Sequence, residues 1–253
     1  MNPDITPNID VALLVFWAFV LFFIALVFYL RREDRREGYP LEDTVTGRLR
    51  IPGGPLSTAS PKSFLLPFDH GVVTAPYNEP REPVDIAARR TDRFPGAPYA
   101  PTGDPLVDGI GPAAWANRAK RPDLDMEGHP RIVPLSTATG FSIAREDSDL
   151  NGWPVLGADG EVAGTVKDLW IDKADRLVRY IELEDGILAP MMMAVVDRRR
   201  RRVKIDAVNA AQFGGVPRLD ANDQITLYEE ERVQAYFGGG YLYANAARQE
   251  PFL

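Results

Sequence analysis

The sequence predicts a chain with one membrane-spanning helix near its N-terminus and a mainly β soluble domain that ends in a short helix. Three observations lead to this prediction. Residues 11–30 form an uninterrupted apolar run, residues 38–134 hold most of the prolines, and the remainder has short β-branched stretches separated by turn residues. These features indicate one span, an irregular connecting segment and one β-rich domain.

The apolar run over residues 11–30 is long enough to cross a bilayer. It has no charged or amide side chain, and fifteen of its twenty residues are Leu, Ile, Val or Phe. At about 1.5 Å per residue, a helix of this length spans roughly 30 Å. A core helix of a soluble protein would show a polar face, which this run lacks. A cleaved signal peptide is not favoured, because no basic region precedes the run.

Basic residues at the ends of the run predict its orientation. Residues 1–10 contain no Lys or Arg, whereas four arginines closely follow Leu30. Basic residues are retained on the cytoplasmic side, so we expect residues 1–10 in the periplasm and the bulk of the chain in the cytoplasm. These arginines are also candidates for contact with anionic lipid headgroups, unless neighbouring acids pair with them instead. The four candidates are Arg31, Arg32, Arg35 and Arg36.

Composition excludes several classes of function. The net charge of −7 argues against nucleic acid as a partner. The absence of Cys excludes thiolate metal sites and cysteine nucleophiles, and the presence of only two His argues against a histidine-rich metal site. No phosphate-binding, zinc-protease or nucleophile-elbow motif is found in the sequence, so we expect that the chain is not an enzyme.

The segment over residues 31–135 is predicted to be extended. Residues 38–134 contain sixteen of the twenty-two prolines, which disfavour long helices and central strands. Aromatic and aliphatic residues recur in the segment, whereas a disordered tether is usually poor in them. We therefore expect a segment that wraps the surface of partner subunits.

Residues 136–253 are predicted to form a small antiparallel barrel. Candidate strands cover residues 162–171, 177–183 and 202–207, with Asp-Gly turn pairs beside them. A capping box from Thr226 to Glu229 predicts a helix over residues 227–237. We expect the three glycines at 238–240 to terminate this helix. The arginine run 198–202 is interpreted as the exposed end of a hairpin in preference to a nucleic-acid or lipid site.

Two acidic groups are candidates for proton transfer. One comprises Asp123, Asp125, Glu127 and His129, and the other comprises Asp168, Asp172 and Asp175. Clustered carboxylates and histidines can pass protons, because repulsion and burial raise some of the pKa values towards working pH. From these residues alone, a solvated acidic loop and ordinary turn residues are the simpler interpretations.

Three motifs carry a resemblance to a known family. They are residues 29–41 (YLRREDRREGYPL), residues 103–112 (GDPLVDGIGP), and residues 164–172 (GTVKDLWID) together with Arg179-Tyr180 and residues 224–230 (QITLYEE). In these motifs, which extend from the membrane span towards the C-terminus, the chain resembles the H subunit of the purple-bacterial photosynthetic reaction centre. The third motif resembles the PRC-barrel of that subunit, which implies a PRC-barrel-like domain over residues 136–253.

The resemblance implies a non-catalytic subunit that binds no pigment itself. Such subunits cap the cytoplasmic face of the two pigment-carrying subunits, L and M, and conduct protons to the secondary quinone. The complex is expected to hold bacteriochlorophyll, bacteriopheophytin, quinones and non-haem iron in the partner subunits. A cytochrome subunit, a light-harvesting antenna and membrane lipids are further expected partners, in the photosynthetic intracytoplasmic membrane of a bacterium.

The resemblance also assigns roles to single residues. Asp125 and His129 match positions where protons enter, and Glu127 replaces a His of some relatives. Asp175 stands where the family often carries Glu, with Asp172 beside it. Arg179 matches a family arginine whose expected role is to keep the inner carboxylates ionised.

A second hypothesis is a membrane-anchored PRC-barrel adaptor that docks a soluble partner without photochemistry. Purification from the native membrane would distinguish the two, since a reaction-centre subunit travels with bacteriochlorophyll absorbance and an adaptor does not.

Overall fold

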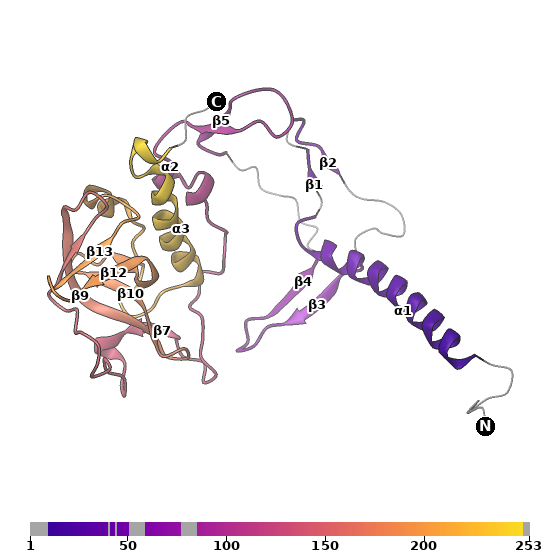
Figure 1. Cartoon of the computed structure of the whole chain (residues 1–253), viewed down its shortest axis with the longest axis horizontal. Helices are drawn as coiled ribbons and strands as arrows, with labels where there is room; N and C mark the ends of the chain where they lie inside the picture. Colours follow the sequence, from indigo (N-terminus) through magenta and orange to yellow (C-terminus); the bar gives the residue numbers. More distant parts are fainter. Residues whose placement is uncertain (1–9, 40, 44, 51–58, 77–84, 250–253) are drawn as a thin grey trace. The chain divides into compact units, whose positions relative to one another are not determined.

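The computed structural model describes residues 10–39, 41–43, 45–50, 59–76 and 85–249. Contacts within the chain divide it into two compact units. The first consists of Met1–Val84 with Asp92–Ala97, and the second of Asp85–Thr91 with Pro98–Leu253. Figure 1 shows a long helix in the first unit and a strand-rich body in the second.

The long helix α1 (Val11–Glu33) covers the predicted span. The Asp10 side chain caps its N-terminus by accepting a hydrogen bond from the Leu13 N–H at 3.0 Å. No residue of α1 is buried against another described part of the chain, which argues against a soluble core helix. The helix runs past the predicted end at Leu30, and the 3-10 helix η1 (Asp34–Arg36) continues it. Its length and composition suffice to cross a membrane.

Two small antiparallel hairpins follow α1 in the first unit. In one, β1 (Leu41–Glu42) pairs with β2 (Leu49–Arg50). In the other, β3 (Lys62–Leu65) pairs with β4 (Val72–Ala75). A hydrogen bond of 2.9 Å from the Leu66 N–H to the Gly71 carbonyl closes the second hairpin. This part of the predicted extended segment therefore has regular local structure.

The second unit is built on one curved sheet. Its strand order is β11-β10-β9-β8-β13-β12, and β7 also pairs with β9. The strands are β7 (Ile132–Pro134), β8 (Pro154–Leu156), β9 (Val162–Asp172), β10 (Leu177–Leu183), β11 (Leu188–Pro190), β12 (Ala194–Asp197) and β13 (Arg202–Ile205). A separate hairpin joins β5 (Ala88–Arg90) to β6 (Tyr99–Pro101).

The sheet has the expected barrel-like arrangement but is not closed by hydrogen bonds. Its two edge strands, β11 and β12, are consecutive in the chain, and the 3-10 helix η4 (Met191–Met193) joins them. Every pairing in the sheet is antiparallel except β8 with β13, which is parallel. The parallel pair departs from the purely antiparallel barrel predicted from the strand spacing.

The arginine run lies at the turn between β12 and β13, as its hairpin interpretation predicted. Arg198 pairs with Asp147 at 2.9 Å, and Arg202 pairs with Asp197 at 3.2 Å. The Arg201 guanidinium lies over the Trp153 ring. These contacts account for three of the five arginines without a nucleic-acid or lipid partner.

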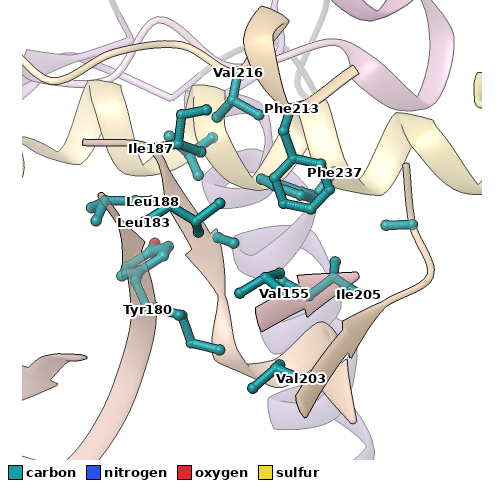
Figure 2. Close-up of a cluster of buried hydrophobic side chains, with 14 of the residues drawn as sticks. Val155, Tyr180, Leu183, Ile187, Leu188, Val203, Ile205, Phe213, Val216 and Phe237 are labelled. Atoms are coloured by element: carbon teal, nitrogen blue, oxygen red, sulfur yellow. The ribbon is translucent and has the colours of Figure 1, made fainter. Parts of the chain in front are cut away.

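The hydrophobic core lies between the concave sheet and the C-terminal helix α3 (Leu227–Tyr243). Figure 2 shows Val155, Val203 and Ile205 of the sheet facing the same interior as Phe213 and Phe237. The Phe213 and Phe237 rings meet edge to face with centroids 5.5 Å apart. The predicted capping box is confirmed, because Thr226 accepts from the Glu229 N–H and Glu229 accepts from the Thr226 N–H.

The predicted end of this helix at its three glycines is wrong. α3 continues through Gly238, Gly239 and Gly240 to Tyr243. A Cβ atom on Gly239 would lie 2.5 Å from the Ala113 Cβ, and one on Gly240 would clash with the Ala207 carbonyl oxygen. These glycines therefore permit close packing of α3 against its neighbours, and the packing compensates for their poor helix propensity.

Residues 103–120 pack on α3 through short helices and aromatic contacts. α2 (Pro105–Asp108) and the 3-10 helix η2 (Gly111–Ala113) both contact α3. Further along, the Arg232 guanidinium of α3 lies 5.1 Å from the Trp115 ring centroid and 5.6 Å from that of Tyr228. This part of the proline-rich segment is thus ordered by contact with its own C-terminal helix.

Candidate functional site

The candidate site forms where β7 and the turn before it meet the end of β9. Ile132 of β7 is registered opposite Asp172, the last residue of β9. The turn over residues 123–131 folds back on itself, with the Asp125 N–H donating to the His129 carbonyl at 2.9 Å. This pairing brings the two acidic groups of the sequence, which are far apart along the chain, to one end of the sheet.

Asp172 is the buried centre of the site, with a fully buried side chain. Its Oδ1 accepts from Arg131 Nε at 2.8 Å, and its Oδ2 accepts from Arg179 at 3.2 Å. Burial acts to raise the pKa of Asp172, but hydrogen bonds from the Arg131 side chain and the Asp175 N–H outweigh it, so the pKa lies below its usual value. Asp172 is therefore held as a carboxylate.

Asp175 lies beside it at the surface, with about half of its side chain exposed (47%). Its carboxylate pairs with Arg131 at 2.6 Å and with Arg179 at 3.3 Å. Asp172 and Asp175 thus share the same two arginines, and we call these four residues the inner group.

Asp125 and Lys173 form the outer pair, with Lys173 Nζ 2.9 Å from Asp125 Oδ2. Asp125 Oδ1 also accepts from the backbone N–H groups of His129 at 2.8 Å and Glu127 at 3.2 Å. The Lys173 hydrogen bond, and then that of the His129 backbone, hold the pKa of Asp125 below its usual value.

His129 and Glu127 surround the outer pair at the surface. The His129 side chain is 71% exposed, and its Nδ1 lies 3.8 Å from Asp125 Oδ1. Glu127 is exposed and contributes its backbone N–H to Asp125. The arrangement therefore leads from exposed titratable groups to a carboxylate that is wholly buried.

Sequence reasoning missed two cations of the site, Lys173 of the outer pair and, at the centre of the site, Arg131. Its guanidinium contacts Asp172, Asp175 and, at 3.5 Å, Asp123. Its backbone joins the outer pair, because the Lys173 N–H donates to the Arg131 carbonyl at 3.0 Å. The available signal was a lone basic residue directly after an acidic turn, but its partners depend on the β7–β9 register, which the sequence does not show.

The expectation that repulsion raises some carboxylate pKa values does not describe Asp125 and Asp172. A hydrogen bond from Lys173 lowers the pKa of Asp125, and one from Arg131 outweighs burial to lower that of Asp172. Asp168, the third acid of the second predicted group, lies apart from these pairs. Its Oδ2 accepts from the Ser136 hydroxyl at 2.5 Å.

The arginines proposed for lipid headgroups differ in their surroundings. The Arg36 side chain is only 10% exposed, and it pairs with Glu33 and donates to the Ser60 and Ala75 carbonyls. Arg31 lies 3.7 Å from Asp34, and the Arg35 guanidinium lies over the Tyr39 ring. Headgroup contact is therefore proposed for Arg31, Arg32 and Arg35, and not for Arg36.

A family model described as the photosynthetic reaction centre, H-chain N-terminal region, matches residues 3–137. This match covers more than half of the chain. The chain belongs to the reaction-centre H-chain family. A second model, the PRC-barrel domain, matches residues 143–212 of this H chain, which include β8 to β13 of the sheet.

Family membership settles the coarse features of the H chain. It is a membrane-anchored subunit of a photosynthetic reaction centre, it associates with the other subunits of that complex, and it binds no pigment itself. The mainly β C-terminal region is the PRC-barrel domain predicted from its sequence motifs.

Proposed function

We propose that this H chain caps the cytoplasmic face of the L and M subunits and conducts protons to the secondary quinone. In this proposal its N-terminus is periplasmic, its barrel is cytoplasmic, and its role is not catalytic. The quinones, bacteriochlorophyll, bacteriopheophytin and non-haem iron are held by the partner subunits. The observation that carries the proposal is the succession from exposed His129 to the outer pair and then to buried Asp172.

The chemistry of a doubly reduced quinone requires such a succession. The reduced quinone takes up two protons, and a protein layer over its pocket excludes bulk water. Protons must then pass between groups that lie within hydrogen-bond reach or one water apart. His129 and Glu127 are placed to collect protons at the surface, because they are exposed beside the outer pair.

The cations of the site favour the passage of protons over their retention on a carboxylate. Asp125 and Asp172 are held ionised, so neither binds a proton firmly at neutral pH. A carboxylate in this state stabilises a hydrated proton passing near it, and the adjacent cation favours the proton's release. Arg131 and Arg179 thereby keep the buried Asp172 from trapping the proton, which is the role that the resemblance implied for Arg179.

Asp175 is the proposed last group of this chain on the path. It is exposed in the isolated chain while its neighbour Asp172 is buried, so it can face a partner subunit. Asp is one methylene shorter than the Glu often found here in the family. We therefore propose that a water molecule completes the step from Asp175 to the quinone pocket.

The test is Asp175→Asn in the complete reaction centre. The first electron transfer to the secondary quinone should be unchanged, and the proton-coupled second transfer should slow roughly 10-fold or more. Flash-induced absorbance changes over a range of pH measure both steps. Asp147→Asn is the matched control, because Asp147 is an exposed acid paired with Arg198 outside the site.

Equal second-transfer rates in both variants across that pH range would remove Asp175 from the path. Slowing of both electron transfers alike would indicate a disturbed quinone pocket and would also count against a relay. The adaptor hypothesis is not retained, since the family match places the chain in a photosynthetic complex.

A further inference from the structure

The β3–β4 hairpin exposes apolar side chains on both of its faces. Its register places Phe64 opposite Val73 on one face and Leu65 opposite Val72 on the other. Between 47% and 82% of each of these four residues is exposed, and Phe68 of the connecting turn is 46% exposed. An isolated hairpin is marginally stable in water, and one that is apolar on both faces needs an apolar environment.

The two halves of the hairpin differ in polarity. The half nearest α1 carries Lys62, Ser63 and Thr74, and the Ser63 and Thr74 hydroxyls hydrogen-bond at 3.1 Å. The outer half carries the apolar pairs. The hairpin therefore has one polar end and one apolar end. This distribution suits the boundary between water and hydrocarbon.

Contacts with α1 fix the polar half at the end of the apolar helix. Arg36 donates to the carbonyls of Ser60 and Ala75, which flank the two strands at that end. Lys62 pairs with Glu33 at 2.9 Å, and its ammonium lies 6.0 Å from the Tyr29 ring centroid. The hairpin is thus attached at the level where α1 leaves the apolar region, as Figure 1 also shows.

The charges around this attachment favour a lipid surface as the occupant. Tyr29, Lys62 and Arg32 line a pocket of about 260 Å³ where the helix meets the hairpin, and Tyr and basic residues are typical of the membrane interface. Asp69 and His70 in the connecting turn limit how deeply the hairpin can enter a bilayer, because placing charged and polar groups in the hydrocarbon centre is energetically unfavourable.

We propose that the β3–β4 hairpin is a second membrane contact of this chain, lying at the headgroup–acyl boundary beside α1. Its apolar half rests among the upper acyl chains, and Lys62 and Arg32 remain among the phosphates. The hairpin would steady the cytoplasmic end of α1 against tilting. This inference depends on the membrane anchoring of α1 and not on the proton path.

Because this chain has no Cys, one introduced thiol takes one label in it, and the unsubstituted complex labelled in parallel gives the background from the other subunits. Leu65→Cys is labelled with bimane in the complete complex, in nanodiscs of equal parts phosphatidylcholine and phosphatidylglycerol. Leu21→Cys in α1 is the membrane control. Met192→Cys, at a site that is 81% exposed in the barrel, is the aqueous control.

We expect the Leu65→Cys label to be quenched more strongly by lipids with a doxyl group near the headgroup than by lipids with one near the end of the acyl chain. The order should be reversed at Leu21→Cys, which lies in the middle of the apolar run. Quenching by iodide should be roughly fivefold weaker than at Met192→Cys. Iodide quenching equal to that at Met192→Cys overturns the proposal. Protection from both quenchers also overturns it, because the hairpin would then be buried against a partner protein.

Discussion

Replacing Arg131 by Gln removes the cation that binds Asp172, Asp175 and Asp123 together. The Asp172 side chain is fully buried and would retain Arg179 as its cationic partner. Loss of a hydrogen bond to a buried charge costs about 1.5–3 kcal/mol, and complete loss of a buried partner costs about 3–5 kcal/mol. Because Arg179 and two backbone N–H groups remain, we expect a loss of about 2 kcal/mol.

The effect should depend on pH with a definite sign. The folded-state pKa of Asp172 is lowered, so its contribution is present above the unfolded-state pKa and is lost as pH falls through the folded-state pKa. Without Arg131, fewer interactions oppose the effect of burial on Asp172, so the folded-state pKa of Asp172 rises. The stability difference between wild type and Arg131→Gln should therefore be largest near pH 7 and should shrink as the solution is acidified.

Calorimetric unfolding of the detergent-solubilised full chain measures this difference. A loss of about 2 kcal/mol corresponds to a lowering of the barrel's Tm by roughly 4–8 °C. Arg198→Gln is the control, because the Arg198–Asp147 pair is more than half exposed on both sides and such pairs contribute about 0–1 kcal/mol. If both variants unfold at the same temperature at pH 7, the assignment of Arg131 as the organising cation is refuted.

Two further predictions address helix packing and the outer pair. Gly240→Ala should destabilise the barrel by about 1–3 kcal/mol, because its Cβ meets the Ala207 carbonyl, whereas Gly238→Ala meets only the Pro112 oxygen at 3.8 Å and should be neutral or stabilising. Equal unfolding midpoints for the two variants in urea would contradict this packing. Lys173→Met should raise the pKa of Asp125, because it removes the hydrogen bond that contributes most to lowering it. Carboxyl ¹³C titration of the full chain tests this, and an unchanged Asp125 titration would show that Lys173 does not control it.

Local features of the fold were predictable because their causes are local. The span of α1 follows from a continuous apolar run, and the start of α3 follows from the Thr226–Glu229 capping box. The hairpin at the arginine run follows from two strands separated by charged residues. In each case the residues that determine the structure lie within a few positions of one another.

Features that depend on distant contacts were not predictable. The glycines of α3 predicted a helix end, but their neighbours Ala113 and Ala207 come from elsewhere in the chain and make small residues necessary. The parallel pairing of β8 with β13 likewise joins strands that are far apart in sequence. The low helix propensity of glycine predicted the wrong end for α3. Tertiary packing of this helix outweighs the destabilisation of about 1 kcal/mol that each glycine causes in a helix.

The candidate site shows the same division. The acidic residues were identifiable from their clustering, but the cations that control them were not, since Arg131 reaches Asp172 only through the β7–β9 register. Only Arg179 was expected to act on these carboxylates, and that expectation rested on family resemblance. The lowered pKa values of Asp125 and Asp172 follow from this arrangement of charges.

The balance of charge among the ion pairs is compatible with the proton conduction that we propose. Four carboxylates, those of Asp123, Asp125, Asp172 and Asp175, meet three cations, Arg131, Lys173 and Arg179. Asp125 and Lys173 form a neutral pair, and the other five side chains carry one net negative charge, which attracts a proton while the cations keep Asp172 from binding it firmly. A site with fewer cations would store protons at buried Asp172, and a site with more would repel them. The proposed conduction therefore depends on arginine and lysine as much as on the acids, and removing either kind of charge should slow it.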